Sequence, residues 1–318
     1  MSNHLIPAVI TQKWAEAEGV FCFTLELPGN EVLPPVEAGA HIDVEIREGV
    51  VRQYSLCQPP GSQHYQIGVL NDPTSRGGSR DLTQSIEVGT VLRISRPRNH
   101  FGLIPSASHS ILIAGGIGIT PILAMAEELN ARGQSFELHY GARSRECAAF
   151  TNRLAHSKFT SHTRLAFDDL GQRLDLTKIL SGPHSDVHVY VCGPSGLIDA
   201  VLATAKAQGW PEGSLHREFF GGAVQHMSEE QEIEVTAARS GLTVIVSPGM
   251  SVAQALVQAG VDVTTFCEQG VCGSCMTRVI EGVPDHRDQY LSDAEKSAGD
   301  QMLLCCSRAR TSALILDI

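Results

Sequence analysis

The chain contains 318 residues, which is enough for two or three domains that each bury a core of their own. Its 35 acidic and 24 basic residues give a net charge of −11, so no basic surface is available for a nucleic-acid backbone, and nucleic acid is excluded as a partner. The N-terminal residues lack the segments of a signal peptide, and the longest apolar stretch, residues 111–125, is too short to span a bilayer. We therefore expect a cytoplasmic protein with no membrane partner, whose nine cysteines are metal ligands or free thiols rather than disulfides.

The first segment, residues 1–104, is a series of short apolar stretches separated by turns. The expected strands are residues 6–11, 20–27, 41–46, 53–56, 65–70 and 91–95. Many short strands at this spacing are typical of an antiparallel β-barrel.

The second segment, residues 105–220, alternates buried strands with helices. The expected elements are a strand at 111–114, a helix at 121–132 and strands at 136–140 and 187–192. This alternation predicts a doubly wound α/β domain. Thr120 is a good N-cap for the helix, Pro121 suits its first turn, and Gly133 suits the position after its last turn.

The third segment follows residues 221–231, which have no helical or strand periodicity and are interpreted as a linker. Residues 232–318 contain expected strands at 233–237, 242–247 and 313–318 and a helix at 251–259. A small sheet crossed by one helix predicts an α+β module with a β-grasp fold.

Four cysteines of this module have the spacing that holds a plant-type [2Fe–2S] cluster. Cys267, Cys272 and Cys275 form C-x4-C-x2-C, and Cys305 follows at a distance. The alternative, a structural zinc site, usually pairs two short hooks, whereas only Cys272 and Cys275 form one here. We therefore predict an iron–sulfur centre and an electron carrier.

Three thiolates from one short loop require a tightly coiled backbone. Gly270 and Gly273 supply the conformations that a Cβ would obstruct. Cys305 comes directly after a short apolar run, which favours it as the fourth ligand and leaves Cys306 pointing the other way. The cysteines outside the ligand set are expected to be small buried hydrophobic residues: Cys22, Cys57, Cys147, Cys192 and Cys306.

A glycine-rich segment, residues 111–121, leads from the expected strand into the expected helix. The backbone amides around Gly116 and Gly118 would face a diphosphate at the helix N-terminus. The segment is not a standard G-x-G-x-x-G, and the same glycines could serve only strand-to-helix packing. A second tight turn, Cys192-Gly193-Pro194, opens after another buried strand at the carboxyl edge of the same sheet, where nucleotides bind.

The preference between NADH and NADPH is open. The second strand of the α/β segment is not followed by an acidic residue that would bind the ribose 2′-hydroxyl, and Arg143 and Arg145 stand there instead. These arginines could accept a 2′-phosphate, or could belong to an ordinary surface turn.

A third motif lies in the barrel segment. Strand alternation places Arg52 and Tyr54 on one face and Gln53 and Ser55 on the other. Alone, this is an ordinary half-buried strand. The later stretch of residues 76–79, with glycine amides and a serine hydroxyl, forms a natural phosphate nest.

These motifs together resemble the phthalate dioxygenase reductase group, including the vanillate demethylase reductases, within the ferredoxin-NADP reductase superfamily. The resemblance extends over essentially the whole chain. Besides the four cysteines, the matching motifs are Arg52-Gln53-Tyr54-Ser55-Leu56, Arg76-Gly77-Gly78-Ser79, Pro97-Arg98-Asn99, residues 114–121, Cys192-Gly193-Pro194, Glu218-Phe219-Phe220-Gly221 and Cys305-Cys306-Ser307-Arg308.

The resemblance implies an FMN-binding barrel at residues 1–104, an NAD(P)-binding domain at 105–220 and a [2Fe–2S] ferredoxin domain at 232–318. The implied cofactor-binding residues are Arg52, Gln53, Tyr54, Ser55, Gly77, Gly78, Ser79, Gly116, Gly118, Thr120, Arg143, Cys192, Gly193, Pro194 and Phe220. FMN is preferred over FAD because no extension that would hold an adenine is evident.

The resemblance also implies an activity and a partner. A hydride passes from NADH, or from NADPH, to FMN, and single electrons then pass through the cluster to a Rieske-type oxygenase or demethylase acting on aromatic compounds. The residues implied to border the hydride contact are Ser55, Thr120, Cys192 and Phe220. Two departures are Cys306, at a position that is usually apolar, and Phe219 beside Phe220.

Three alternatives compete with this interpretation. A complete oxygenase would need a Rieske centre or an iron site, and His184 and His188 have no carboxylate at a suitable spacing. A redox-sensing cluster protein would keep the cysteines without turnover. A stand-alone diaphorase would deliver electrons to another acceptor.

Overall fold

The computed structural model describes residues 5–30, 33–48, 50–71, 78–220, 230–265, 268, 270–271 and 273–318. The chain divides into two compact units, Met1–Phe220 and Gly221–Ile318, and each is described by itself. Among the residues in these ranges, no helix is both long and apolar enough to span a bilayer.

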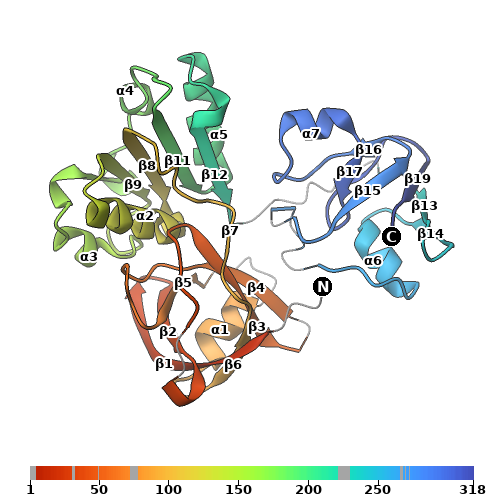
Figure 1. Ribbon diagram of the computed structural model, residues 1–318, viewed down its shortest axis with the longest axis horizontal. Helices are drawn as coiled ribbons and strands as arrows, with labels where there is room; N and C mark the ends of the chain where they lie inside the picture. Colours follow the sequence, from red (N-terminus) through yellow and green to blue (C-terminus); the bar gives the residue numbers. More distant parts are fainter. Residues whose placement is uncertain are drawn as a thin grey trace. The chain divides into compact units, whose positions relative to one another are not determined.

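The N-terminal part of the first unit is an antiparallel barrel (Figure 1). Its strands are β1 (Ile6–Ala17), β2 (Val20–Glu26), β3 (Ala40–Arg47), β4 (Val50–Ser55), β5 (Tyr65–Leu70), β6 (Val91–Ile94) and β7 (Arg98–Asn99). The strand order is β4-β3-β6-β1-β2-β5, and a bridge between Leu56 and Ile67 joins the two ends. Alternate side chains such as Phe23, Leu25 and Ile42 fill the interior because successive residues of a strand face opposite sides. The barrel strands predicted from the sequence are therefore confirmed.

The C-terminal part of the first unit is a parallel sheet with helices on both faces. Its strands are β8 (His109–Gly115), β9 (Phe136–Ala142), β10 (Thr163–Phe167), β11 (Val187–Gly193) and β12 (Leu215–Phe219), in the order β10-β9-β8-β11-β12. The helices of the first unit are α1 (Gly78–Ser85), α2 (Ile119–Arg132), α3 (Thr151–Ala155), α4 (Leu176–Ile179) and α5 (Ser195–Ala207). Leu112 and Ala114 share a buried cluster with α2, whereas Ile111 and Ile113 share one with α5, as expected for a doubly wound domain.

The start of α2 differs from the prediction. A 3-10 turn at Gly116–Gly118 continues directly into α2, so Gly118 is the N-cap. Thr120 lies inside the first turn of the helix and donates a hydrogen bond from Oγ1 to Ile117 O at 3.0 Å. Its prediction as the N-cap was wrong because the tight turn lets the helix begin earlier. The predicted end is confirmed, since Gly133 closes the helix in the left-handed conformation with φ 66°.

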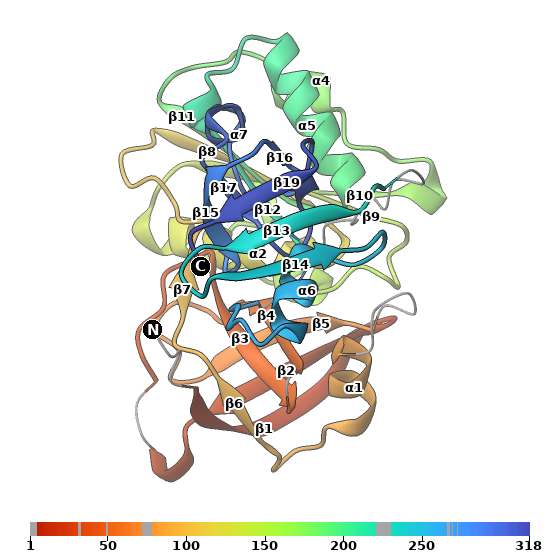
Figure 2. The same ribbon diagram turned by 90° about the vertical axis from the view of Figure 1, so that its right-hand side faces the viewer.

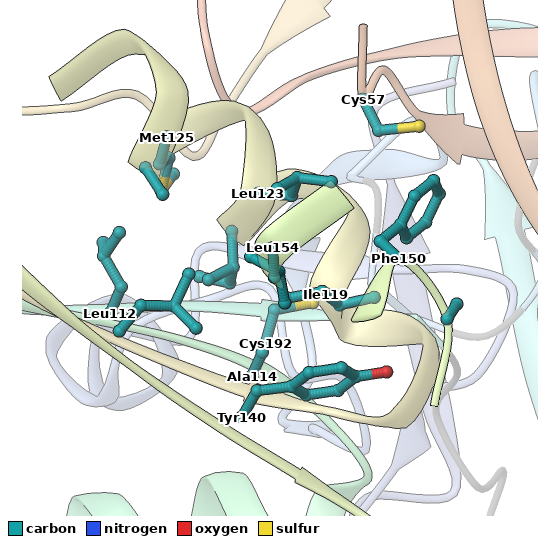
Figure 3. Packing of buried hydrophobic residues seen from close by; sticks show 14 of the residues in the cluster. Cys57, Leu112, Ala114, Ile119, Leu123, Met125, Tyr140, Phe150, Leu154 and Cys192 are labelled. Atoms are coloured by element: carbon teal, nitrogen blue, oxygen red, sulfur yellow. The ribbon is translucent and has the colours of Figure 1, made fainter. Parts of the chain in front are cut away.

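The barrel and the parallel sheet share one hydrophobic cluster. Cys22 and Cys57 of the barrel belong to the same cluster as Tyr140, Phe150 and Cys192 of the α/β part (Figure 3). This shared packing explains why residues 1–220 form a single compact unit. A domain boundary at residue 104 therefore stays a prediction.

The second unit is a small α+β module, and Figure 2 shows its main sheet with α6. Its elements are β13 (Ile233–Ala237), β14 (Leu242–Val246), α6 (Val252–Gln258), β15 (Met276–Glu281), β16 (Pro284–Asp285), α7 (Asp293–Ala298), β17 (Gln301–Leu303), β18 (Arg308–Ala309) and β19 (Ala313–Leu316). The main sheet has the order β14-β13-β19-β15-β17. Ser251 caps α6 through a reciprocal capping box with Gln254, and the apolar side of α6 joins the sheet in one core.

The end of the predicted linker belongs to this module. Most of the linker lies outside the described residues, but Glu230 forms ion pairs with Arg287 and, at 3.5 Å, with Arg308. Arg308 also donates to Gln231 O at 2.9 Å and to Val246 O at 3.1 Å. Residues 230 and 231 are thus held by the second unit rather than forming a free connection.

Candidate functional site

The predicted phosphate-binding residues of the barrel lie together. The hydroxyls of Tyr54, on β4, and Ser79, on α1, are 3.0 Å apart. The Arg52 side chain lies against Gly78, because a methyl group there would come within 2.9 Å of Arg52 Cγ and Nε. A cation, two hydroxyls and the start of a helix suit a phosphate monoester, so these residues fit FMN. Gly77 and the preceding residues of the predicted nest lie outside the described residues.

The other face of β4 has a separate polar network. Gln53 donates from Nε2 to Asp43 Oδ1 at 2.9 Å, and the fully buried Asp43 pairs with Arg98 at 2.6 Å. Ser55 is also buried on this face, directly opposite His41. The alternation expected from the sequence is confirmed, although the Gln53 side chain holds the strand rather than joining Tyr54 and Ser79.

Ser55 connects the barrel strand to the parallel sheet. Its Oγ donates a hydrogen bond to Glu218 Oε2, on β12, at 3.2 Å. Desolvation of the Glu218 carboxylate raises its pKa to about 8, although the hydrogen bond from Ser55 opposes this shift. Glu218 can therefore hold or release a proton near neutral pH, beside a predicted flavin-contacting residue.

Glu218 lies in the motif Glu218-Phe219-Phe220-Gly221, which by itself indicates no role for the carboxylate. The available signal was its position two residues before Phe220, a predicted flavin contact. Across the sheet, Glu218 is also the register partner of Cys192. Ser55, Cys192 and Glu218 thus meet where the two halves of the first unit join.

The turn at Gly116–Gly118 and the turn at Cys192-Gly193-Pro194 contact each other through their backbones at the carboxyl edge of the parallel sheet. Cys192 on β11 is paired with Ala114 on β8, which places both turns at one edge as predicted. A methyl group at Gly118 would come within 2.3 Å of Cys192 O and 2.6 Å of Gly193 N. Only glycine permits this backbone approach, and the edge offers a compact cradle of amides that fits a diphosphate.

Cys192 is a neutral thiol in this environment. Its side chain is fully buried. Burial, and then the nearby Glu218 carboxylate, raise the pKa of Cys192 well above its ordinary value. Its contribution is therefore packing and shape rather than thiolate chemistry.

Thr120 and the predicted arginines lie apart from this centre. Thr120 is buried, and its methyl group packs at Gly68 of β5, where an added Cβ would be 2.8 Å from it. Arg143 and Arg145 are both exposed after the end of β9, and the Arg145 guanidinium lies 5.1 Å from the centre of the Phe167 ring. Both arginines therefore stay accessible to a ribose or its phosphate, and Arg145 also contacts an aromatic ring.

The two neighbouring phenylalanines have different environments. Phe219 packs against the cluster between the sheet and α5. Phe220 follows β12 and keeps 39% of its surface exposed. The accessible ring, Phe220, is the one that can stack on a planar cofactor, consistent with the implied assignment.

The cysteine loop of the second unit is shaped by its glycines. Gly270 and Gly273 have φ values of 73° and 72°, which a side chain disfavours. A methyl group at Gly273 would come within 2.4 Å of the Tyr290 ring, and one at Gly270 within 2.5 Å of Cys306 Sγ. These two glycines therefore have the left-handed conformation that was expected for a tightly coiled backbone.

Two of the four predicted cluster ligands are described. Cys275 and Cys305 are buried, and Leu304 N donates to Cys275 O at 3.3 Å, which brings their segments together. Cys267 and Cys272 lie outside the described residues. Two converging buried cysteines beside a glycine loop fit an iron–sulfur centre.

The cysteines outside the ligand set mostly match the prediction. Cys22, Cys57, Cys192 and Cys306 are buried, and burial raises the pKa of Cys57 to about 12. Cys147 is only half-buried, so its assignment as a buried residue was wrong. The Cys306 sulfur faces the Gly270 backbone, so it borders the cysteine loop although it was expected to point away.

His184 and His188, which were considered as ligands of an iron site, contact other residues. His188 Nδ1 lies 2.9 Å from His216 Nε2, and their rings stack with centroids 5.1 Å apart. His184 lies near Asp186 at 4.0 Å on an exposed turn.

Comparisons with known proteins agree with this arrangement. A sequence family described as an oxidoreductase NAD-binding domain matches residues 112–203, and one described as a 2Fe-2S iron-sulfur cluster binding domain matches residues 235–310. A vanillate O-demethylase oxidoreductase from Pseudomonas sp. (strain HR199 / DSM 7063) is 46% identical over 317 residues, covering 99% of this chain and 100% of the relative.

A reductase subunit of phthalate 4,5-dioxygenase from Pseudomonas putida is 39% identical over 307 residues, which are 95% of this chain and 93% of the relative. The solved structure of a phthalate dioxygenase reductase, described as a modular structure for electron transfer from pyridine nucleotides to [2Fe–2S], is 37% identical. It superposes with a TM-score of 0.79 over 99% of this chain and 98% of its own. The chain therefore belongs to the phthalate dioxygenase reductase and vanillate O-demethylase oxidoreductase family, the NAD(P)H-dependent oxidoreductases that use FMN and a [2Fe–2S] cluster.

Proposed function

We propose that this chain is the reductase component of a two-component Rieske-type oxygenase or demethylase that acts on aromatic compounds in the cytoplasm. Full-length relatives named for vanillate demethylation and phthalate dioxygenation support the partner and the substrate class. The nine cysteines, interpreted as metal ligands and free thiols rather than disulfides, support a cytoplasmic location.

The observation that carries the site assignment is the hydrogen bond between Ser55 and Glu218, because it joins the proposed flavin strand to the nucleotide sheet. Arg52 and Ser79 bind the FMN phosphate, and Tyr54 and Ser55 border its ring system. Gly77 and Gly78 complete the phosphate loop.

The nucleotide is held at the two glycine turns. Gly116, Gly118 and Gly193 present amides to the diphosphate, while Pro194 shapes the second turn. Arg143 contacts the ribose end, and Phe220 covers the ring where nicotinamide enters.

In this proposal, Glu218 and Ser55 hold and transfer a proton next to the flavin ring. When bound, FMN accepts a hydride and releases its electrons singly to a one-electron centre. Glu218, with its pKa of about 8, holds a proton that Ser55 can relay toward the ring. Cys192 packs at the same junction and excludes water there, whereas Thr120 packs apart from it, against Gly68 of β5. Cys267, Cys272, Cys275 and Cys305 hold the cluster.

The first experiment separates this proposal from a redox sensor. When NADH is added without oxygen, the absorbance of the bound flavin should bleach at least as fast as the enzyme turns over. The reduced protein should then reduce added cytochrome c. Intact cofactors with no bleaching would favour a sensor without turnover.

The second experiment addresses the partner. The second unit has 13 acidic and 6 basic residues, a net charge of −7, so docking to an oxygenase should weaken as ionic strength rises. Reconstitution with a purified vanillate or phthalate oxygenase should give NADH-dependent product formation. Fast dye reduction without transfer to any Rieske oxygenase would favour the stand-alone diaphorase.

A further inference from the structure

Arg153, on α3, connects the barrel to the nucleotide sheet. Its Nε and Nη2 donate to both carboxylate oxygens of Glu127 on α2, at 2.7 and 2.5 Å. Its Nη1 donates to Cys57 O at 2.8 Å and to Gln66 Oε1 at 2.9 Å, both in the barrel part. One planar guanidinium therefore contacts three segments that are distant in sequence.

The contacted segments lead directly to the two proposed cofactor sites. Cys57 is two residues beyond Ser55, and its N–H donates to Gln66 O at 2.9 Å. Glu127 lies on α2, the helix that starts at the Gly118 turn. At a rise of 1.5 Å per residue, Glu127 is about 13 Å from that turn along the helix axis. A displacement at Arg153 would thus change the separation of the flavin strand and the diphosphate turn.

The junction around Arg153 is tightly packed. Phe150, three residues earlier, has a φ of 61°, a conformation unfavourable for an aromatic residue, and its N–H donates to Glu16 Oε1 of the barrel at 3.0 Å. Gly68 has no room for a side chain, because a methyl group would come within 2.8 Å of Thr120 and 3.3 Å of Phe150. Figure 3 shows Cys57 and Phe150 within the buried cluster that this junction covers.

We propose that Arg153 is a positioning residue for hydride transfer, which fixes the separation of the Ser55 strand end and the Gly118 turn without touching either cofactor. The proposal rests on the function assigned above. Hydride transfer requires the reacting atoms to approach within about 3 to 3.5 Å, and a misplacement of about 1 Å can cost on the order of 100-fold in rate. A bidentate ion pair between Arg153 and Glu127, next to the strained backbone of Phe150, is a suitable device for setting such a distance.

The test compares Arg153→Ala and Arg153→Lys with the wild-type holoenzyme in stopped-flow mixing with NADH. In the alanine variant we expect the limiting rate of flavin bleaching to fall by about 10- to 100-fold, while FMN content and the apparent Kd for NADH change by less than about 2-fold. Lysine keeps the positive charge but cannot donate to both Glu127 oxygens and the barrel acceptors from one planar group. The bleaching rate of Arg153→Lys should therefore lie between those of the alanine variant and the wild type. Deuterated NADH should give a primary isotope effect on the reduced limiting rate.

A second readout needs no turnover. Amide hydrogen exchange in residues 56–68 should accelerate in Arg153→Ala, whereas exchange in residues 233–246 of the second unit should stay unchanged. If the alanine variant is recovered poorly, Glu127→Gln removes the same ion pair and should slow bleaching in the same direction.

The matched control is Arg132→Ala. Arg132 pairs with Glu128 on the same helix at 2.7 Å and is exposed, so its loss should leave the bleaching rate unchanged. An unaltered rate in folded Arg153→Ala would overturn the proposal, as would a slower rate that follows FMN loss or a matching rise in Kd. Absence of bleaching in the wild-type protein would instead refute the proposed function.

Discussion

Glu218 is the single residue whose chemistry depends most on its surroundings. The carboxyl group has an ordinary pKa of 4.5, which desolvation raises to about 8 while Ser55 partly offsets the effect. A proton held there at neutral pH lies beside Ser55, at the junction of the barrel and the nucleotide sheet. The same shift makes the stability of the first unit depend on pH.

The first prediction concerns that dependence. Between about pH 4.5 and 8 the folded protein keeps a proton that the unfolded chain releases, so its stability falls as pH rises through this window. Glu218→Gln removes the titrating group and should flatten that slope. Melting temperatures of both proteins between pH 5 and 9 provide the measurement. A difference between the two that stays constant with pH would contradict the raised pKa.

The second prediction concerns Arg52. Charge-assisted hydrogen bonds contribute about 1.5 to 3 kcal/mol, so Arg52→Ala should raise the Kd for FMN by about 10- to 100-fold. Fluorescence titration of the flavin-free protein measures this constant. Arg47→Ala is a suitable control, since Arg47 is exposed on neighbouring β3 and pairs with Asp81 of α1 at 3.0 Å. Equal FMN affinity in both variants would remove Arg52 from the site.

Single residues were predictable where local rules decide them. Strand alternation correctly separated Tyr54 from Gln53, and the glycine requirement at Gly270 and Gly273 followed from backbone sterics. The roles of Glu218 and Arg153 could not be found this way, because each depends on a partner far away in sequence.

At the scale of elements, the two glycine turns form one unit across the sheet edge. Their backbones touch, so each turn limits the conformation of the other. The sequence predicted both turns and their common edge, because parallel strands end on the same side. It missed the 3-10 turn before α2, since Thr120 satisfies the local preference for an N-cap while tertiary packing at Gly68 decides its position.

The third prediction tests the contact between these turns. In Gly118→Ala the new methyl group would meet Cys192 O and Gly193 N, and overpacking of this kind costs about 1 to 3 kcal/mol. We expect the apparent Kd for NADH to rise on the order of 10-fold, with FMN retained. Gly196→Ala is the matched control: the space around Gly196 on α5 is open, and the change should stabilise the protein by about 0.4 to 1 kcal/mol. Unchanged NADH affinity in Gly118→Ala would count against the diphosphate site.

At the scale of the whole molecule, residues 1–220 and 221–318 form separate compact units. The three expected fold types are present, but the first two share a core that the sequence could not reveal, because it arises from contacts between side chains such as Cys22 and Tyr140. Thermal unfolding should therefore proceed in two steps rather than three.

The fourth prediction uses the cluster to assign those steps. Cys305→Ser should prevent cluster assembly and lower only the transition of the second unit, because metal binding stabilises the module that supplies the ligands. Differential scanning calorimetry, with iron content measured in parallel, distinguishes the two transitions. Cys306→Ser should keep the iron, and loss of iron there but not in Cys305→Ser would reverse the ligand assignment.

The apolar cluster shared by β2, α2 and α3 also constrains recombination among relatives. A crossover at residue 104 would separate the two halves of one core, and the incoming side chains would have to refit around Cys57 and Phe150. With a crossover between Phe220 and Gly221, all residues of each hydrophobic cluster come from the same parent protein. Chimaeras joined there should inherit hydride chemistry from one parent and choice of electron acceptor from the other.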